Sequence, residues 1–260
     1  MTTLLTCADI SVHFEALAAI DRLSFTVERG QVLGIGGPNG AGKTTLFDVI
    51  CGLVRPTAGR VLLNGVEITR LRPDRICQLG VARTFQLNAA FDSLTVRENV
   101  LLASCFGYRP RLIPPVWIDK ATRARVDGAL EATALLSMSQ EPVAMLPVLY
   151  RKLLMIAGAL VTDPQLVLMD EPVGGLNPGE IERIAELVEQ LAAQGTTIVL
   201  IEHVMRFLIR LSDRVMIMHH GQKIFEGAPR AMISDSAVVE TYLGVGSAQA
   251  LQQWLGSTGR

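Results

Sequence analysis

The strongest constraint on this 260-residue chain is the segment Gly-Pro-Asn-Gly-Ala-Gly-Lys-Thr at positions 37–44, which fits the pattern G-x-x-x-x-G-K-[ST]. It comes directly after an apolar run, residues 31–35, and directly before a helical pattern, residues 45–54. Glycines allow backbone N–H groups to turn inward around a phosphate, and the following helix adds its partial positive charge. The order strand, loop and helix therefore predicts a phosphate-binding loop in an α/β fold.

Two side chains of this segment carry the expected chemistry. Lys43 is expected to reach the outer phosphates of a nucleotide, and Thr44 offers a hydroxyl group to Mg²⁺. The other residues expected to surround the nucleotide are Asn39, Gly40, Ala41, Gly42 and Thr45. A plain glycine-rich turn before a helix is the alternative, and the complete motif in its full context disfavours it.

An apolar strand that ends in two carboxylates indicates a second part of the site. Residues 166–169 are Leu-Val-Leu-Met, and Asp170 and Glu171 follow them. Open α/β sheets bind ligands at this end of their strands. We expect Asp170 to hold Mg²⁺ through water and Glu171 to polarise an attacking water. The alternative is an aspartate that caps the turn before Pro172, which the nearby phosphate loop makes the weaker interpretation.

Two more polar residues follow predicted strands. His203 comes after the apolar run 196–201, where it can donate to a phosphate oxygen or to the attacking water. A structural histidine with satisfied hydrogen bonds is the alternative. Gln86 follows the strand-like run 81–85, and its chemistry alone gives it no special role.

The order of the elements predicts an α/β fold built from several parts. In the first third of the chain short strands alternate with turns, and Asn64-Gly65 is a strong hairpin signal, so we expect an antiparallel sheet there. A helical pattern begins near residue 94, where Thr95 and Glu98 have the spacing of a capping box, and another covers residues 119–138. In the second half apolar strands alternate with helices, which is typical of a parallel sheet covered on both faces.

Two segments differ from this pattern. The prolines within residues 108–117 forbid a continuous helix and predict an irregular surface excursion. Residues 247–260 are polar and contain Gly and Ser, which predicts a loosely held tail. We therefore expect one domain over residues 1–246, followed by this tail.

Composition excludes several classes of function. The 24 Lys and Arg residues nearly balance the 25 Asp and Glu residues, so nucleic acid is not expected as the main partner. Although 49% of the residues are hydrophobic, charged residues interrupt every apolar stretch before the roughly 18 residues that a spanning helix needs. The first ten residues lack the pattern of a secretion signal, so a cytoplasmic protein is expected. The 4 cysteines have neither zinc-site nor disulfide spacing.

Together the motifs resemble those of the ATP-binding subunits of ABC transporters over roughly residues 4–244. The motifs occur in the family's order: Walker A at 37–44, a Q-loop ending at Gln86, Walker B ending at Asp170 and Glu171, a D-loop at 174–177 and an H-loop at His203. The strings Val-Ala-Arg-Thr-Phe-Gln, Gly-Gly-Leu-Asn-Pro and Ile-Glu-His-Val-Met are most similar to the subunits of branched-chain amino-acid importers. Urea and short-chain amide systems are closely related.

The resemblance implies a P-loop NTPase core of the RecA-like kind with a mixed sheet, an N-terminal antiparallel β-subdomain and a helical subdomain inserted at about residues 87–160. It implies that Phe14 stacks on adenine, with a core phenylalanine as the alternative. Gln86 becomes the hinge that reports the γ-phosphate and Mg²⁺ to the helical subdomain. The implied cofactors are ATP and Mg²⁺, and the implied roles are metal binding for Thr44, Gln86 and Asp170 and catalysis for Lys43, Gln86, Glu171 and His203.

One departure from the family concerns its signature, Leu-Ser-Gly-Gly-Gln, which is expected at residues 146–150. The chain has Leu-Pro-Val-Leu-Tyr there. Pro147 has neither a hydroxyl nor an N–H group, and each lost donor to a developing charge can cost on the order of 3 kcal/mol. We expect an apolar loop packed on a helix that begins near Arg151. Gly158 also replaces an arginine that is usual in the family, and the sequence gives no account of it.

The resemblance implies an ATPase subunit that pairs head-to-tail with a second ATPase subunit and energises an importer of branched-chain amino acids or related small amides. The altered signature favours a heterodimer with one competent site over a homodimer. Two transmembrane permease subunits, and indirectly a substrate-binding protein, are the other implied partners, at the inner face of the cell membrane. The alternatives are a regulatory subunit with little hydrolysis and a soluble ABC-type ATPase outside transport.

Overall fold

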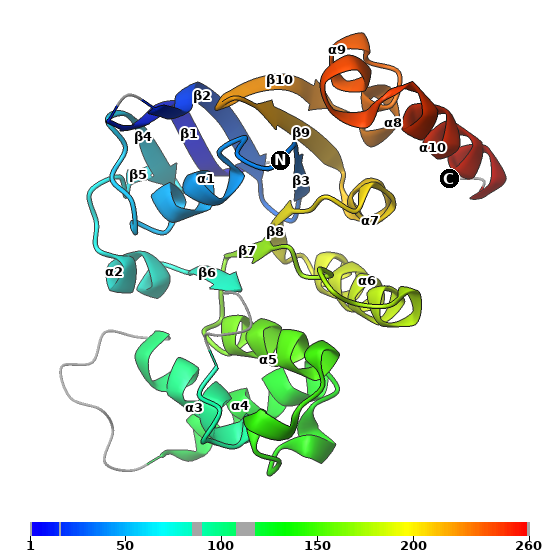
Figure 1. Ribbon diagram of the computed structural model, residues 1–260. Helices are drawn as coiled ribbons and strands as arrows, with labels where there is room; N and C mark the ends of the chain where they lie inside the picture. Colours follow the sequence, from blue (N-terminus) through cyan, green and yellow to red (C-terminus); the bar gives the residue numbers. More distant parts are fainter. Residues whose placement is uncertain (1, 16, 85–89, 108–117, 259–260) are drawn as a thin grey trace. The chain divides into compact units, whose positions relative to one another are not determined.

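The computed structural model describes residues 2–15, 17–84, 90–107 and 118–258 (Figure 1). The chain divides into two compact units. Unit 1 comprises Met1–Arg70 and Val199–Arg260, and unit 2 comprises Leu71–Ile198.

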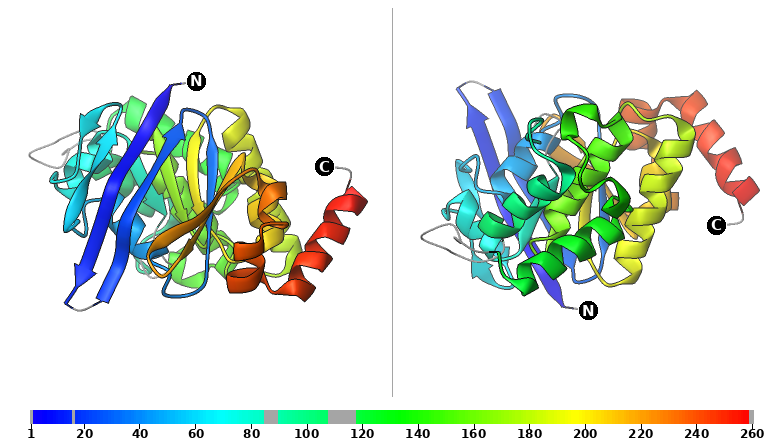
Figure 2. Two further views of the ribbon diagram at one scale, coloured as in Figure 1. Left: turned by 90° about the horizontal axis from the view of Figure 1, so that it is seen from above. Right: turned by 90° about the horizontal axis from the view of Figure 1, so that it is seen from below.

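The first sheet of unit 1 is antiparallel, as predicted. Its strands are β1 (Thr3–Phe14), β2 (Leu17–Glu28), β4 (Ala58–Leu63) and β5 (Val66–Glu67), in the order β2-β1-β4-β5. The long pair of β1 and β2 is visible in Figure 2. Asn64 and Gly65 join β4 to β5 with φ angles of 53° and 75°, which a two-residue hairpin of type I′ requires. The predicted Asn-Gly hairpin is confirmed.

The second sheet of unit 1 is mixed and positions the phosphate-binding segment. Strand β3 (Val32–Gly36) runs parallel to β9 (Arg214–His219), and β9 pairs with β10 (Gln222–Gly227) in the antiparallel sense. All five residues of β3 are buried, which explains its continuous apolar run. Helix α1 (Lys43–Ile50) follows β3 along the chain, and α7 (Met205–Leu211) packs on β3.

The C-terminal part of unit 1 differs from the prediction of a loosely held tail over residues 247–260. After α8 (Pro229–Met232), α9 (Ser236–Val238) and the π-helical turn η4 (Val239–Leu243), the chain forms helix α10 (Val245–Thr258). Ala248 and Leu251 of α10 are buried, and the Arg206 guanidinium of α7 lies 5.7 Å from the centre of the Trp254 ring. Ala248 and Leu251 lie three positions apart and give α10 one buried face. The sequence did not reveal this face, because most residues of the segment are polar or small.

The strands of unit 2 place the two predicted carboxylates. Strand β6 (Val81–Thr84) runs parallel to β7 (Leu166–Asp170), in a register that sets Arg83 opposite Leu168. Helix α2 (Pro73–Gln78) precedes β6, and helix α6 (Pro178–Ala193) follows β7 along the chain. Strand β8 (Thr197–Ile201) follows α6 and leads the chain from unit 2 into unit 1.

Unit 2 also contains the predicted helical part, in which α3 (Val96–Gly107), α4 (Lys120–Ala132) and α5 (Val148–Leu160) pack on one another (Figures 1 and 2). Two 3₁₀ turns, η2 (Leu136–Met138) and η3 (Val143–Met145), lie between α4 and α5. The predicted capping box is confirmed, because the Thr95 N–H donates to Glu98 Oε2 and the Glu98 N–H donates to Thr95 Oγ1. The Thr95 N–H and the Thr95 hydroxyl both donate to Glu98 Oε2, and these two bonds hold the pKa of Glu98 below its usual value.

The helix predicted over residues 119–138 is shorter in the structure. Asp119 caps its start by accepting the Thr122 N–H at 2.7 Å. The helix ends at Ala132 because Ala134 takes a left-handed conformation, with φ at 55°. The excursion predicted for residues 108–117 lies outside the described residues.

The four cysteines are free, and Cys7 is fully buried, which raises the pKa of its thiol. Within the described ranges, the helices are all too short or too polar to cross a membrane.

Candidate functional site

The loop between β3 and α1 depends on glycine at two positions. Gly37 has φ at 143°, and a Cβ atom there would lie 2.2 Å from the Met218 carbonyl oxygen. Gly42 caps α1 with φ at 96°, and a Cβ atom there would lie 2.3 Å from the Ala19 carbonyl oxygen. Side chains are therefore excluded at both positions, and the loop backbone folds closely against β9 and β2.

Lys43 places a cation inside this loop. Its Nζ atom donates to the carbonyl oxygens of Gly37 at 2.7 Å and Pro38 at 2.9 Å, and the residue is buried. Helix α1 begins at Lys43, so the loop combines a positive charge with the positive end of the helix and its first N–H groups. Among the other predicted contacts, Asn39, Gly40 and Thr44 are exposed, Gly42 and Thr45 are half-buried, and Ala41 is buried. This arrangement suits an anion such as a phosphate.

Tyr242, in η4, is a residue of the site that the sequence did not reveal. Its phenol oxygen accepts the Gly37 N–H, while the Gly37 carbonyl accepts Lys43. Gly37 is thereby held at both of its backbone polar groups. Burial raises the pKa of Tyr242, and the Glu202 carboxylate adds to the rise, although the bond from Gly37 acts in the other direction. No local motif marks Tyr242, because its partner is distant in the sequence.

Replacing Tyr242 by phenylalanine is expected to lower the free energy of unfolding by about 1 kcal/mol, since the Gly37 N–H loses its acceptor. The raised pKa adds a pH signature. The unfolded chain loses the phenol proton near pH 10, before the folded chain does, so the stability linked to this group falls as pH rises beyond about 10. Urea denaturation of wild type and Tyr242→Phe between pH 8 and 11 would measure both effects. Tyr150→Phe is the control, and an unchanged alkaline profile in Tyr242→Phe would contradict the assignment.

His203 lies in the turn between β8 and α7, as its position after a strand predicted. Its side chain is 54% exposed, and its Nδ1 atom lies 3.7 Å from Glu202 Oε2. The Glu202 side chain is fully buried and accepts the N–H groups of His203 at 3.0 Å and Val204 at 3.3 Å. The Glu202 N–H in turn donates to the carbonyl of Ile35 in β3 at 3.2 Å. Glu202 thus fixes the turn and leaves the imidazole exposed to a ligand.

Phe14 lies at the end of β1, paired in register with Leu17. Its side chain is 48% exposed, so the alternative of a core phenylalanine is wrong. An exposed aromatic face in unit 1 can stack on a planar ring.

Asp170 ends β7 in unit 2 and forms a buried ion pair. The Arg83 Nη2 atom lies 2.7 Å from Asp170 Oδ2, and both side chains are 7% exposed. The Asp170 N–H also points to Thr84 Oγ1, at 3.4 Å. The sequence predicted the position of Asp170 but not its partner, although Arg83 stands within the Arg-Thr-Phe-Gln string.

Glu171 follows with an exposed side chain and a left-handed backbone, with φ at 47°. This conformation costs a residue other than glycine about 1–2 kcal/mol. Lys152 Nζ of α5 donates to the Glu171 carbonyl at 2.9 Å, and the Gly174 N–H donates to it at 3.3 Å. Such local strain is typical of functional residues that the surrounding structure holds in place.

The predicted site residues thus fall into two groups. Unit 1 contains Phe14, the loop residues and His203, and unit 2 contains Asp170 and Glu171. Gln86 lies outside the described residues. Over the described ranges, no group of three or more His, Cys, Asp or Glu side chains could hold a metal ion by itself.

The segment that corresponds to the family signature forms the start of α5. The helix begins at Val148 rather than near Arg151, and Pro147 occupies its N-cap without a side-chain hydrogen bond. Proline is tolerated there because the first N–H groups of a helix have no partner within it. Leu146 and Leu149 are buried, as expected of an apolar loop, whereas Met145 and Val148 are exposed. This helix start therefore presents apolar side chains to solvent.

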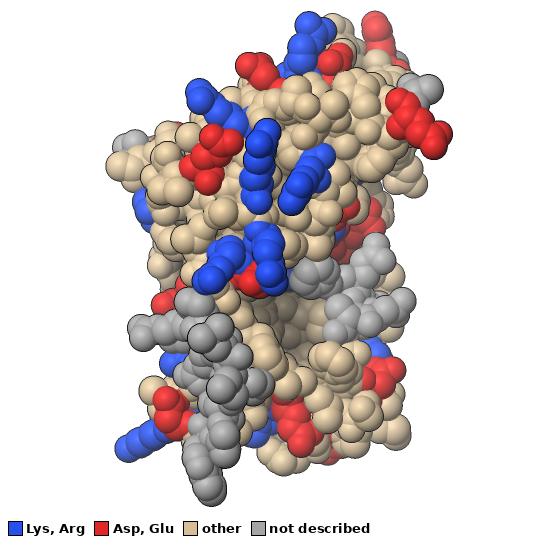
Figure 3. Space-filling view, turned by 90° about the vertical axis from the view of Figure 1, so that its left-hand side faces the viewer, with Lys and Arg blue, Asp and Glu red and all other residues tan. Residues whose placement is uncertain are grey.

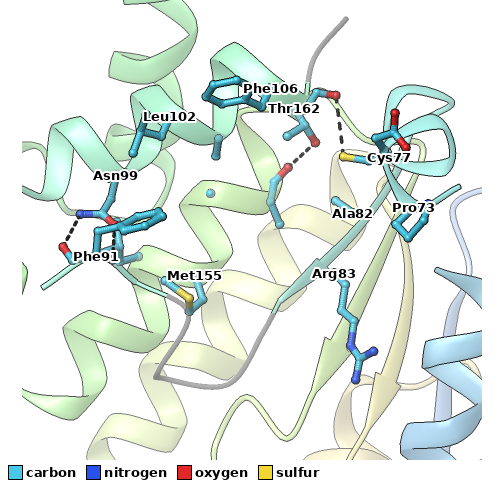
Figure 4. A pocket seen from close by; sticks show the side chains of 16 residues that line it. Pro73, Cys77, Ala82, Arg83, Phe91, Asn99, Leu102, Phe106, Met155 and Thr162 are labelled. Carbon is cyan, nitrogen blue, oxygen red and sulfur yellow. Dashed lines mark hydrogen bonds between the residues drawn. The ribbon is translucent and has the colours of Figure 1, made fainter. Parts of the chain in front are cut away.

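Unit 2 also contains an open cavity of about 500 Å³. Its walls come mainly from α3 and α5, with α2 and β6 beside them, and include Phe91, Leu102, Phe106 and Met155 (Figure 4). Gly158 lines it as well, and a Cβ atom there would meet only the Ala103 Cβ, at 3.9 Å. Figure 3 shows the hollow, with a floor of uncharged side chains. The absence of a side chain at Gly158 keeps this wall open.

Comparison with known proteins gives concordant matches. The family model described as ABC transporter matches residues 20–174. The high-affinity branched-chain amino acid transport ATP-binding protein LivG of Escherichia coli (strain K12) is 32% identical over 249 residues, which cover 93% of this chain and 98% of that protein. The probable LivG protein of Methanocaldococcus jannaschii is 34% identical over 246 residues, which cover 91% of this chain and 95% of that protein.

Solved structures agree with these matches. The ADP conformation of an ATP-binding cassette of an ABC transporter has a TM-score of 0.85 and 32% identity, and the match covers 94% of this chain and 100% of that chain. A nucleotide-free ATP-binding cassette has a TM-score of 0.85 and 31% identity, with the same two coverages.

Proposed function

Because this chain belongs to the ABC transporter family and is an ATPase of that family, we propose that it energises an importer of branched-chain amino acids or of related small amides. The observation that carries the proposal is the loop of Gly37 and Lys43, in a chain that matches the LivG proteins over nearly their whole length. The strings around Gln86, Asn177 and His203 support the same class of substrate.

In unit 1, we assign the triphosphate to the loop. Lys43 and the backbone N–H groups at the start of α1 bind the phosphates, and the exposed ring of Phe14 stacks on adenine. His203 donates to the γ-phosphate, since Glu202 fixes its backbone and leaves its ring exposed. Tyr242 keeps Gly37 in place before the nucleotide arrives.

The donor groups fit Mg²⁺. This ion prefers oxygen ligands and is usually held by one or two carboxylates together with the phosphates of the substrate. The hydroxyl of Thr44 and the carboxylate of Asp170 are such ligands, with Gln86 as the third residue that the family resemblance implies. When bound, Mg²⁺ neutralises charge on the phosphates.

Glu171 is the residue that we assign to activate the attacking water. Its exposed carboxylate directly follows Asp170, and Lys152 holds its backbone in the left-handed conformation. A carboxylate in this position accepts a proton from water as the water attacks phosphorus.

We assign the cavity in unit 2 as the docking site for a permease subunit. A short cytoplasmic helix with an apolar face matches its apolar walls, and the exposed rings of Phe91 and Phe106 would be covered in the complex. In this arrangement the chain lies at the inner face of the membrane through two permease subunits, and a substrate-binding protein acts through them.

The start of α5 favours pairing with a different ATPase subunit. In a head-to-tail dimer this segment would meet the γ-phosphate of the partner's ATP, and Pro147 offers it neither a hydroxyl nor an N–H group. The chain's own ATP would instead meet the signature of its partner. We therefore propose a heterodimer with one competent site rather than a homodimer.

ATP hydrolysis by the purified chain and by the reconstituted transporter tests the proposal. The chain alone is expected to hydrolyse ATP at least about 100-fold more slowly than the complex, since a lost oxyanion donor costs about 10²–10³ in rate. The triple change Pro147→Ser, Val148→Gly and Leu149→Gly is expected to raise the rate of the chain alone. Fast hydrolysis by the unaltered chain, abolished by Glu171→Gln, would contradict the heterodimer.

The altered signature also favours a second candidate, a regulatory subunit that binds ATP with little hydrolysis. It predicts that Glu171→Gln leaves turnover in the reconstituted complex unchanged. The strained and anchored Glu171 argues against this candidate.

A further inference from the structure

The ion pair between Arg83 and Asp170 acts on the carboxylate that the proposed function assigns to Mg²⁺. Arg83 lies opposite Leu168 in the register of β6 and β7, and Asp170 stands two residues further along β7. Residues two apart on a strand point to the same face, so the long Arg83 side chain reaches the Asp170 carboxylate across the sheet. Figure 4 shows this side chain extending from β6 away from the cavity that its own residue helps to line.

The geometry of the pair leaves half of the carboxylate available. Arg83 Nη2 donates to Asp170 Oδ2 at 2.7 Å, and Oδ1 forms no hydrogen bond or ion pair with the described residues. The Asp170 N–H is directed to Thr84 Oγ1 at the same time. The backbone and one oxygen are fixed, and this determines the direction in which Oδ1 points.

The Arg83 pair differs from the Arg97 pair of unit 2 in its burial and in its partner. The pair of Arg97 and Asp127 elsewhere in unit 2 is half-buried, with side chains 32% and 43% exposed, whereas both side chains of the Arg83 pair are 7% exposed and one of them is the predicted metal ligand. Groups that hydrogen-bond to a ligating carboxylate orient it, and their loss lowers metal affinity.

We propose that Arg83 is a positioning residue, which holds Asp170 by Oδ2 so that Oδ1 faces Mg²⁺ or its bound water. The inference rests on the proposed function. It predicts that Arg83 matters for the effect of Mg²⁺ on nucleotide binding and matters little for nucleotide binding without the ion.

Isothermal titration calorimetry of the full chain with the non-hydrolysable analogue adenylyl imidodiphosphate, in EDTA and at rising Mg²⁺, tests the proposal. In Arg83→Met, affinity in EDTA is expected to equal that of wild type, because Lys43 and the loop are unchanged. The Mg²⁺ concentration that gives half of the gain in affinity is expected to rise by about 10- to 100-fold. Arg83→Lys keeps the charge and is expected to lie between the two. Arg97→Met, which removes the half-buried pair with Asp127, is the matched control and should behave as wild type.

The outcomes distinguish a failure of the positioning role of Arg83 from a failure of the proposed function. If Arg83→Met shows the Mg²⁺ dependence of wild type, or if it loses affinity equally with and without Mg²⁺, the positioning role is wrong. If Arg83→Met does not fold, as judged by its melting transition, Arg83→Lys decides, and an unchanged Mg²⁺ dependence in that variant overturns the proposal. A wild-type chain that binds no analogue in either condition contradicts the proposed function instead.

Discussion

Lys43→Ala is expected to lower the affinity of the chain for ATP by about 10- to 100-fold, because a charged hydrogen-bond donor contributes about 1.5–3 kcal/mol. The buried ammonium group donates to the Gly37 and Pro38 carbonyls and is the positive charge at the centre of the loop. Without it, the phosphates would meet the backbone N–H groups of α1 alone. Equilibrium binding of ATP, measured by calorimetry, gives the change directly.

The melting transition of Lys43→Ala must show that this variant is folded. The two carbonyl oxygens released from Lys43 lie beside exposed loop residues, where water can replace the ammonium group, so the melting transition should remain cooperative. Lys120→Ala, at the start of helix α4 in unit 2, is the control and should bind as wild type. Undiminished ATP affinity in a folded Lys43→Ala protein would show that the loop does not bind the phosphates.

Glu171→Gln is expected to slow ATP hydrolysis in the assembled transporter by about 10²–10⁴-fold, which is the usual contribution of a general base. The amide keeps the shape of the side chain and leaves the bond from Lys152 to the backbone carbonyl intact. ATP binding should therefore persist, and the complex should accumulate with ATP bound. Single-turnover measurement of phosphate release gives the rate of the chemical step.

Glu180→Gln is a matched control for this change in the same unit. Glu180 closes the capping box of α6, where its Oε2 accepts the Asn177 N–H at 2.9 Å, and glutamine can make the same bond. Hydrolysis by Glu180→Gln should equal that of wild type. Equal rates for wild type and Glu171→Gln would remove Glu171 from the mechanism.

Local chemistry explains which features could be predicted from the sequence. The Asn64-Gly65 turn and the capping box of Thr95 and Glu98 involve residues within a few positions of one another, and both formed as expected. The position of Lys43 at the start of the helix after β3, and that of Asp170 at the end of β7, followed from the same kind of short-range pattern. Strand ends and turns are decided locally, so a single sequence contains the information.

Contacts between distant segments could not be predicted. The partner of Gly37 is Tyr242 and the partner of Asp170 is Arg83, and neither pair has a spacing that a motif records. Helix α10 was missed for a related reason, since its buried face is small and polar residues surround it. The exposure of Phe14 could not be predicted either, because a phenylalanine at the end of a strand fits a core and a surface equally well.

The contact between Tyr242 and Gly37 has a consequence for the order in which the protein is made. Ribosomes synthesise the glycine loop early and Tyr242 near the end of the chain, so a nascent chain contains every residue of the loop before the support for Gly37 exists. A product cut short before Tyr242 would retain the complete motif and yet lack this support. The hydrogen bond that supports the Gly37 N–H therefore forms only after the segment that contains Tyr242 has been made.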